Sequence, residues 1–339
     1  MTFILVALQK SVLIFESSKS GWKTTETLKG DPQTIAFDRG NSNRLYCGTF
    51  KSGLLKSDNR GESWERIGEN VISSPAVMSV SVDQNGISKN GFSKVYVGTE
   101  PSALYTSTDG GVSWEKMDGL NRLDSSGTWS FPPRPWTHHV RWIEIDSNDP
   151  NRIFVAIEAG ALVQSLDGGK NWIDRVEGSP YDTHTLRTHL KAPERLYVAA
   201  GDGYFESFDY GKSWTMPNKG LGHNYLVSLA LDSTDPQSVI VSASHTAMQS
   251  HAIDQADSVI YRKSKEDEKW HLPVGLPQSE GTLATMLSSN PSSGGEFYGV
   301  NNRGIFCSTD SGITWEALEI QWSNEYILQH PYGIVVSEG

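Results

Sequence analysis

The sequence is poor in the features that mark disulfide-stabilised domains and membrane spans. Its 339 residues contain only two cysteines, which excludes a disulfide framework as the basis of the fold. No run approaches the ~18 consecutive apolar residues of a membrane helix. The apolar N-terminus lacks the basic flank and small-residue cleavage site of a signal peptide. We therefore expect a cytoplasmic protein without a membrane partner, whose cysteines are buried as small apolar side chains.

Positive charge is also scarce. The chain has 29 Lys and Arg residues against 40 Asp and Glu residues, and its formal net charge is −11. This balance repels phosphate backbones and acidic lipid surfaces, and no Lys/Arg cluster reverses it locally, so we expect no nucleic-acid partner. What is abundant instead is glycine, with 32 residues, and tryptophan, with 11 residues, as in a turn-rich globular protein.

One short pattern recurs along the chain. It reads S-x-D-x-G-x-[ST]-W and occurs, intact or with one change, at residues 57–64, 107–114, 165–172, 207–214 and 308–315. Its Asp and Ser side chains can bond neighbouring amides, its Gly accepts a positive φ, and its Trp can bury a ring against the next sheet. The pattern therefore predicts a hairpin turn with a structural role for Asp109, Asp167, Asp209, Asp310, Trp64, Trp114, Trp172, Trp214 and Trp315.

The spacing of these turns predicts the fold. With two eroded copies ending at Trp22 and Trp270, seven tryptophans follow one another at intervals of 42 to 58 residues. This is the period of a four-stranded propeller blade. We predict an all-β fold and one domain over residues 1–339, a seven-bladed β-propeller with four-stranded antiparallel blades. Polar turns that begin at Asp38, Asp146 and Asp232 should link the first two strands of their blades.

The first blade lacks its first strand at the N-terminus. Residues 3–9 already resemble a second strand, and residues 11–15 resemble a third. We predict that the C-terminal segment, residues 326–335, supplies the missing strand and closes the ring, because closure removes free sheet edges.

The repeated turn resembles the Asp-box, or BNR repeat. This repeat is found in sialidases, two-domain xyloglucan-degrading hydrolases, sortilin-type receptors and a photosystem II assembly factor, which share a fold element and no single activity. Residues 134–142 and 201–207 are similar to a prokaryotic group of cytosolic Asp-box propellers labelled glycosyl hydrolase or sialidase-like. Asp-box sialidases look six-bladed and carry an Arg-Ile-Pro element, whereas seven blades are counted here and no Arg-Ile-Pro occurs. The resemblance therefore argues against a sialidase.

Propeller topology separates the repeated turns from the expected site. Loops between second and third strands, and between blades, share the face opposite the Asp-boxes, so a functional site should use them. Carboxylates beside imidazoles suit general acid–base catalysis or a divalent metal. We predict catalytic roles for Glu158, His184 and His139. The predicted ligand-binding residues are Glu100, Trp136, His138, Arg141, Asp182, Tyr225, His245, Asn302 and Arg303.

The least repetitive stretch, residues 127–141, is rich in proline and aromatic residues. It is either a stacking surface for a polar or sugar-like ligand or a plug that closes the top of the propeller.

The sequence leaves two functions open. One is a hydrolase or lyase for a small polar ligand, such as a sugar derivative or lactone, in which a divalent metal could take part without a ligand set being assigned. The other is a non-catalytic propeller that binds a protein or small ligand through the same face.

Overall fold

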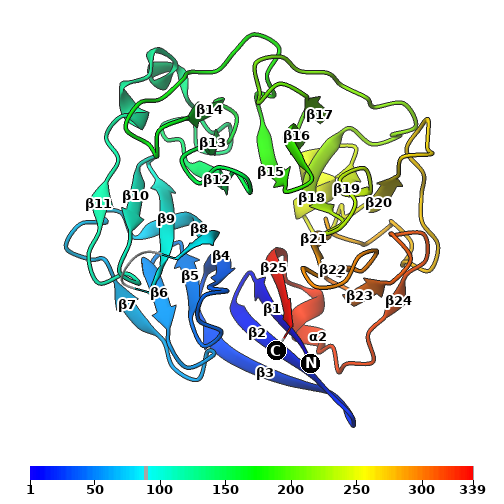
Figure 1. The fold of residues 1–339 in the computed structure, drawn as a ribbon. Coiled ribbons are helices and arrows are strands. Elements are labelled where there is room, and N and C mark those ends of the chain that lie inside the picture. Colours follow the sequence, from blue (N-terminus) through cyan, green and yellow to red (C-terminus); the bar gives the residue numbers. More distant parts are fainter. Residues whose placement is uncertain (88–90, 339) are drawn as a thin grey trace. The chain divides into compact units, whose positions relative to one another are not determined.

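The computed structural model describes residues 1–87 and 91–338, and short antiparallel strands make up most of its regular structure. These strands form seven sheets, which are the blades of an all-β, seven-bladed propeller (Figure 1). The predicted fold class is therefore confirmed. The chain divides into two compact units, which are described separately: the first unit comprises residues 1–29, 197–206 and 215–339, and the second comprises residues 30–196 and 207–214. The assignment of residues 1–339 to one domain stays a prediction.

The second unit contains three blades in full, and their strands follow the predicted order. The strands of these blades are β4 (Pro32–Phe37), β5 (Leu45–Thr49), β6 (Leu54–Ser57) and β7 (Glu65–Ile67); β8 (Ala76–Ile87), β9 (Ser93–Glu100), β10 (Leu104–Ser107) and β11 (Glu115–Lys116); β12 (Val140–Ile145), β13 (Ile153–Ile157) and β14 (Ala161–Ser165). A further sheet contains β15 (Thr183–His189), β16 (Ala192–Ala200) and β17 (Gly203–Ser207). The first strands β4, β8, β12 and β15 lie side by side in this order.

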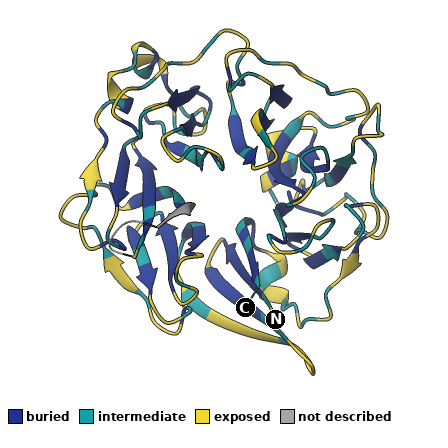
Figure 2. Ribbon diagram, viewed as in Figure 1, coloured by how far each residue is buried: buried dark blue, intermediate teal, exposed yellow. Residues whose placement is uncertain are grey.

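The first unit contains the two chain termini and three further blades in full. Its strands are β1 (Thr2–Leu8), β2 (Ser11–Ser18) and β3 (Gly21–Lys29); β18 (Tyr225–Leu231), β19 (Val239–Ser244) and β20 (Ser258–Lys263); β21 (Met286–Ser289), β22 (Phe297–Asn301), β23 (Gly304–Ser308) and β24 (Glu316–Ala317); and β25 (Pro331–Glu338). Strands β1 and β2 are mostly buried, whereas β3 is largely exposed (Figure 2). No helix in the described part of the chain is long and apolar enough to cross a membrane.

The C-terminal segment completes the first blade, as predicted. β25 pairs antiparallel with β1, and the sheet order is β25-β1-β2-β3 (Figure 1). The predicted bounds are wrong at both ends, because Asn324–Ile327 forms the short helix α2 and the strand runs from Pro331 to Glu338. Tyr326 therefore belongs to the helix.

Three blades have three strands, so the prediction of four strands is wrong for them. Where a fourth strand would lie, each has a single bridge, namely Gln164–Ile173, Glu206–Thr215 and Arg262–His271. Pro217 and Pro273 each follow two residues after such a bridge, and proline has no amide hydrogen to continue a ladder. In the blade with the Gln164–Ile173 bridge, Asp174 follows the bridge and accepts hydrogen bonds from the Ser125 amide (2.8 Å) and hydroxyl (2.5 Å).

The repeated turns are closed by local hydrogen bonds. In one of them the Ser107 hydroxyl donates to Asp109 (2.8 Å) and accepts from the Gly111 amide (2.9 Å). Asp109 also accepts from the Ser113 amide (2.9 Å), and the Trp114 indole donates to the Gly111 carbonyl (3.1 Å). The same contacts recur around Asp167, Asp209 and Asp310, and Asn59 makes equivalent ones in its turn.

These hydrogen bonds lower the pKa of the turn aspartates. Bonds from the Asn171 amide and side chain hold the pKa of Asp167 at about 2. The hydrogen bond from the Ser213 hydroxyl likewise lowers the pKa of Asp209 to about 2. The ionised carboxylates therefore act as acceptors within the turns.

Tryptophan at the end of the repeat packs on the preceding blade. The Trp172 ring lies against the buried cluster that contains Met117 and Leu120. Gly119 adjoins it so closely that an added Cβ would lie 2.7 Å from Trp172 Cδ1. The φ of Gly119 is −60°, which any residue adopts, so space rather than backbone conformation requires glycine here.

Gly119→Ala is therefore expected to lower the free energy of unfolding by ~1–3 kcal/mol through overpacking against Trp172. Chemical denaturation followed by tryptophan fluorescence measures this change. Gly127→Ala is the matched control, because an added Cβ meets no atom within 4 Å at Gly127. Equal stability of the two variants would contradict the packing role of Gly119.

Candidate functional site

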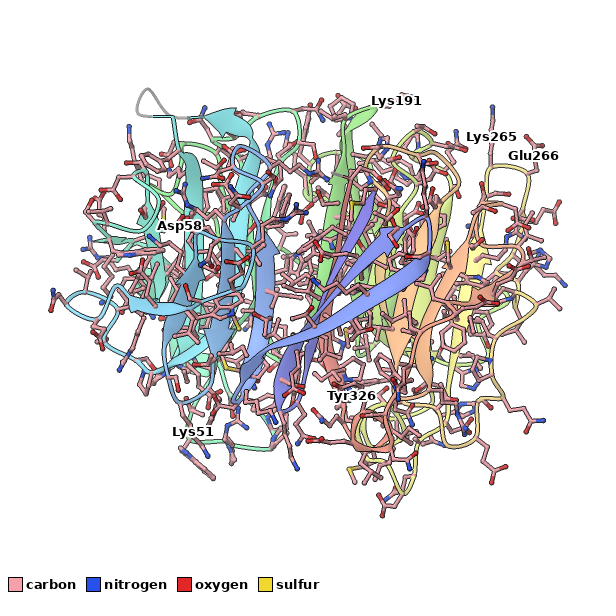
Figure 3. The ribbon with its side chains drawn as sticks, turned by 90° about the horizontal axis from the view of Figure 1, so that it is seen from below. Lys51, Asp58, Lys191, Lys265, Glu266 and Tyr326 are labelled. Atoms are coloured by element: carbon pink, nitrogen blue, oxygen red, sulfur yellow. The ribbon has the colours of Figure 1, made fainter. Side chains whose placement is uncertain are left out.

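The loops of the second unit lie at two ends of its sheets, as the topology requires. Lys51, between β5 and β6, and Lys191, between β15 and β16, lie at opposite ends (Figure 3). Loops between second and third strands therefore lie away from the hairpins between first and second strands. Glu158 belongs to the first kind, since it follows β13 and precedes β14.

Glu158 and His139 meet because their strands pair. The register joins Val140 of β12 to Ile157 of β13, which places the residue before β12 beside the residue after β13. The Glu158 amide donates to the His139 carbonyl (3.3 Å), and His139 Nε2 lies 2.7 Å from Glu158 Oε2. His139 is buried, with 2% of its side chain exposed, whereas Glu158 keeps 14% exposed. The pair therefore has a buried imidazole and a carboxylate that solvent reaches.

Two further groups extend the site on the β15 side. His184 Nε2 lies 3.7 Å from Glu158 Oε1 and 3.6 Å from Asp182 Oδ1, both longer than a hydrogen bond. The backbone amide of Ala159 donates to Asp182 Oδ1 (3.0 Å) and holds this carboxylate in place. The structure thus brings together the three predicted catalytic residues and two predicted ligand-binding residues. We call this group the Glu158 cluster: Glu158, His139, Arg141, Asp182 and His184.

The Glu158 carboxylate is ionised at neutral pH. Burial acts to raise its pKa, but the electrostatic interactions with His139, Arg141 and His184 and the hydrogen bond from His139 outweigh burial and hold the pKa of Glu158 well below its usual range. Arg141 Nε lies 3.5 Å from Glu158 Oε2. Glu158 is therefore a weak base at neutral pH, and its fixed negative charge can orient an imidazole or bind a cation.

Glu100 supports the cluster from the other side. It is 7% exposed, and its Oε2 lies 3.5 Å from His139 Nδ1. The Arg134 guanidinium binds it in a bidentate manner, with Nε to Oε1 at 2.7 Å and Nη2 to Oε2 at 2.6 Å. The same guanidinium lies over the rings of Phe131 and Phe50. The sequence analysis did not identify Arg134. Its position between Pro133 and Pro135, which restrict the backbone, was the one signal that could have indicated it.

The proline-rich segment contributes both buried and exposed aromatic rings. Trp129 is buried, its indole donates to the Ser125 hydroxyl (3.0 Å), and its ring meets His138 edge-on at 5.5 Å. Phe131 meets His139 edge-on at 4.7 Å. Burial and the electrostatic interaction with His139 lower the pKa of His138. Trp136 instead has 80% of its surface exposed, which leaves its ring available to a ligand.

Four predicted ligand-binding residues belong to the first unit, whereas the Glu158 cluster belongs to the second. The ring of His245 lies 4.0 Å from that of His223, and Tyr225 meets His251 edge-on at 6.0 Å. Asn302 and Arg303 hydrogen-bond the loop at residues 280–283, where their polar atoms bind main-chain and threonine groups. These contacts stabilise the loop, and the ligand-binding role of the four residues stays a prediction.

The seven blades define the class of fold, a β-propeller. Residues 105–116 match the family model described as BNR/Asp-box repeat. No curated protein sequence matches the chain.

Solved structures share the propeller fold at low sequence identity. A GH74 enzyme from Niastella koreensis is 17% identical, with a TM-score of 0.66 over 91% of this chain and 51% of that chain. YCF48 from Cyanidioschyzon merolae is 13% identical, with a TM-score of 0.58 over 84% of each chain. YCF48 bound to D1 peptide is 17% identical, with a TM-score of 0.58 over 84% of this chain and 80% of that chain. The chain spans about half the length of the GH74 enzyme, and at these identities the likeness shows the fold alone.

Proposed function

We propose that the chain is a hydrolase or lyase that acts on a small polar ligand, such as a sugar derivative or lactone, at the Glu158 cluster. The observation that carries the proposal is the position of Glu158. Its carboxylate is ionised, hydrogen-bonded to the buried His139 and 3.7 Å from His184, and part of its surface is open to solvent. Two imidazoles beside one carboxylate form a set that can take up and return protons at neutral pH.

The second carboxylate widens the chemistry that this cluster supports. Asp182 offers an oxygen within 4.8 Å of the Glu158 and His184 donor atoms. Pairs of carboxylates serve glycoside hydrolysis, one as acid and one as base or nucleophile. A carboxylate with an imidazole instead suits the opening of an ester or lactone. The test must therefore include all three substrate classes.

A panel of lactones, esters and glycosides, assayed with the wild-type chain and with Glu158→Gln, tests the proposal. We expect turnover of one class, reduced ~10²–10⁴-fold by Glu158→Gln, because the variant lacks the negative charge that orients His139 for proton transfer. Glu177→Gln is the matched control, since Glu177 is exposed in the same unit. Substrate turnover unchanged in Glu158→Gln would end the proposal, provided that the variant remains folded by circular dichroism.

A non-catalytic binding propeller is the second candidate. The exposed Trp136 favours it, because a large aromatic ring at the surface suits recognition of a protein or ligand. YCF48 bound to D1 peptide shows that a propeller of the same fold can hold a peptide. Under this alternative, Trp136→Ala weakens ligand binding and the wild-type chain turns over no member of the substrate panel.

A further inference from the structure

The geometry points to a divalent-metal site formed by Glu158, Asp182 and His184. This inference rests on the proposed function, because the ion would lie in the cluster where the ligand is proposed to react. The cation we infer is a first-row divalent ion of the Mn²⁺ or Zn²⁺ type. Each residue offers one donor atom, and all three donor atoms lie within 4.8 Å of one another.

The His184 nitrogen is too far from either carboxylate oxygen for a hydrogen bond, and these spacings are close to those of ligands around one ion. Glu158 Oε2 is 2.7 Å from His139, a normal hydrogen bond, whereas Glu158 Oε1 is 3.7 Å from His184. The His184 to Asp182 separation is 3.6 Å. Ligands held at ~2.1 Å from one ion lie roughly 3.0–3.4 Å apart, so small side-chain movements would close the group around a cation.

Fixed neighbours orient two of the three donors. The Ala159 amide holds Asp182 Oδ1 at 3.0 Å. His139 holds Glu158 Oε2, which leaves Oε1 toward His184, and Glu100 in turn lies 3.5 Å from His139 Nδ1. The hydrogen bonds from Ala159 and His139 are outer contacts of the kind that position the ligands of metal sites.

Charge and exposure fit the same interpretation. Two carboxylates beside one imidazole supply the negative charge that a divalent cation requires, and the nearest guanidinium, Arg141, lies on Oε2 rather than Oε1. His184 is 2% exposed, whereas Asp182 is 25% and Glu158 is 14% exposed. The buried imidazole would thus form the base of the site and leave the solvent side for water or a ligand. Imidazole among the donors favours Mn²⁺ or Zn²⁺ over Ca²⁺ or Mg²⁺, which prefer oxygen.

Titration of the EDTA-treated full chain with MnCl₂ or ZnCl₂ tests the site, with isothermal calorimetry as the readout. We expect one ion per chain in the wild type and at least ~10-fold weaker binding in Asp182→Asn and in His184→Ala. Asp118→Asn is the matched control, because Asp118 is exposed and pairs only with Lys116 among the salt bridges of the described residues, and it should bind like the wild type. Asp182→Asn keeps the side-chain oxygen that accepts from Ala159, so it decides the question if His184→Ala does not fold.

Absence of saturable binding to the wild type, or wild-type affinity in a folded Asp182→Asn chain, would overturn the metal site. The outcomes separate this inference from the proposed function. Turnover that depends on Glu158, in a chain that shows no saturable binding of Mn²⁺ or Zn²⁺, rejects the metal site and leaves the hydrolase or lyase. Metal binding that is lost in Asp182→Asn, without turnover of any substrate, leaves the metal site and removes the proposed activity.

Discussion

Truncation after His330 is expected to abolish the native fold of the first blade and to leave the chain prone to aggregation. The deletion removes β25, which pairs with β1 along most of its length. It also exposes the core that Ile334 and Val336 cover, where each buried side chain contributes ~1.5–3 kcal/mol. The unpaired edge of β1 would then be open to other chains. Size-exclusion chromatography and thermal unfolding of the truncated chain measure the loss.

Two point variants in β25 measure how much of this stability comes from the side chains that the strand buries, because both variants keep the backbone that pairs with β1. Ile334→Ala removes a side chain that is 7% exposed and is expected to cost ~2–5 kcal/mol. Val335 points to the other side of the strand and is only partly buried, so Val335→Ala should cost less than half as much. A truncated chain with wild-type stability would show that β25 does not complete the blade.

Replacement of Glu100 by glutamine is expected to cost about 3 kcal/mol of unfolding free energy. Glu100 is almost fully buried and pairs with the Arg134 guanidinium at 2.6–2.7 Å. Removing one partner of a buried ion pair leaves the other charge without compensation, and this cost exceeds the contribution of the intact pair. One third of the Arg134 side chain is exposed, so water limits the loss. Chemical denaturation of Glu100→Gln, with the exposed Glu115→Gln as control, measures it.

A double-mutant cycle identifies the source of this effect. Combining Glu100→Gln with Arg134→Met should recover part of the lost stability, because both charges are then absent. The cycle also tests the predicted ligand-binding role of Glu100. If Glu100 contacts a ligand instead of anchoring Arg134, its replacement lowers ligand affinity and leaves the unfolding free energy unchanged.

Much of the candidate site could be predicted, and the missing parts have a physical cause. Glu158, His139 and His184 were identified from residue type and loop position, and the structure brings their side chains together. Arg134 escaped notice because its partner Glu100 lies 34 residues earlier in the chain, and only packing places the two side chains in contact. The catalytic roles, the cytoplasmic location and the absence of a nucleic-acid partner stay predictions.

The sequence by itself determined the blade count and the hairpin turns. Each Asp-box turn is closed by hydrogen bonds within eight neighbouring residues, so the pattern that forms the turn can be read directly from the chain. Tertiary structure alone decided which blades keep a fourth strand and how far apart Glu158, Asp182 and His184 lie. Strand register and blade packing set those separations between residues distant in sequence, and no local pattern encodes them.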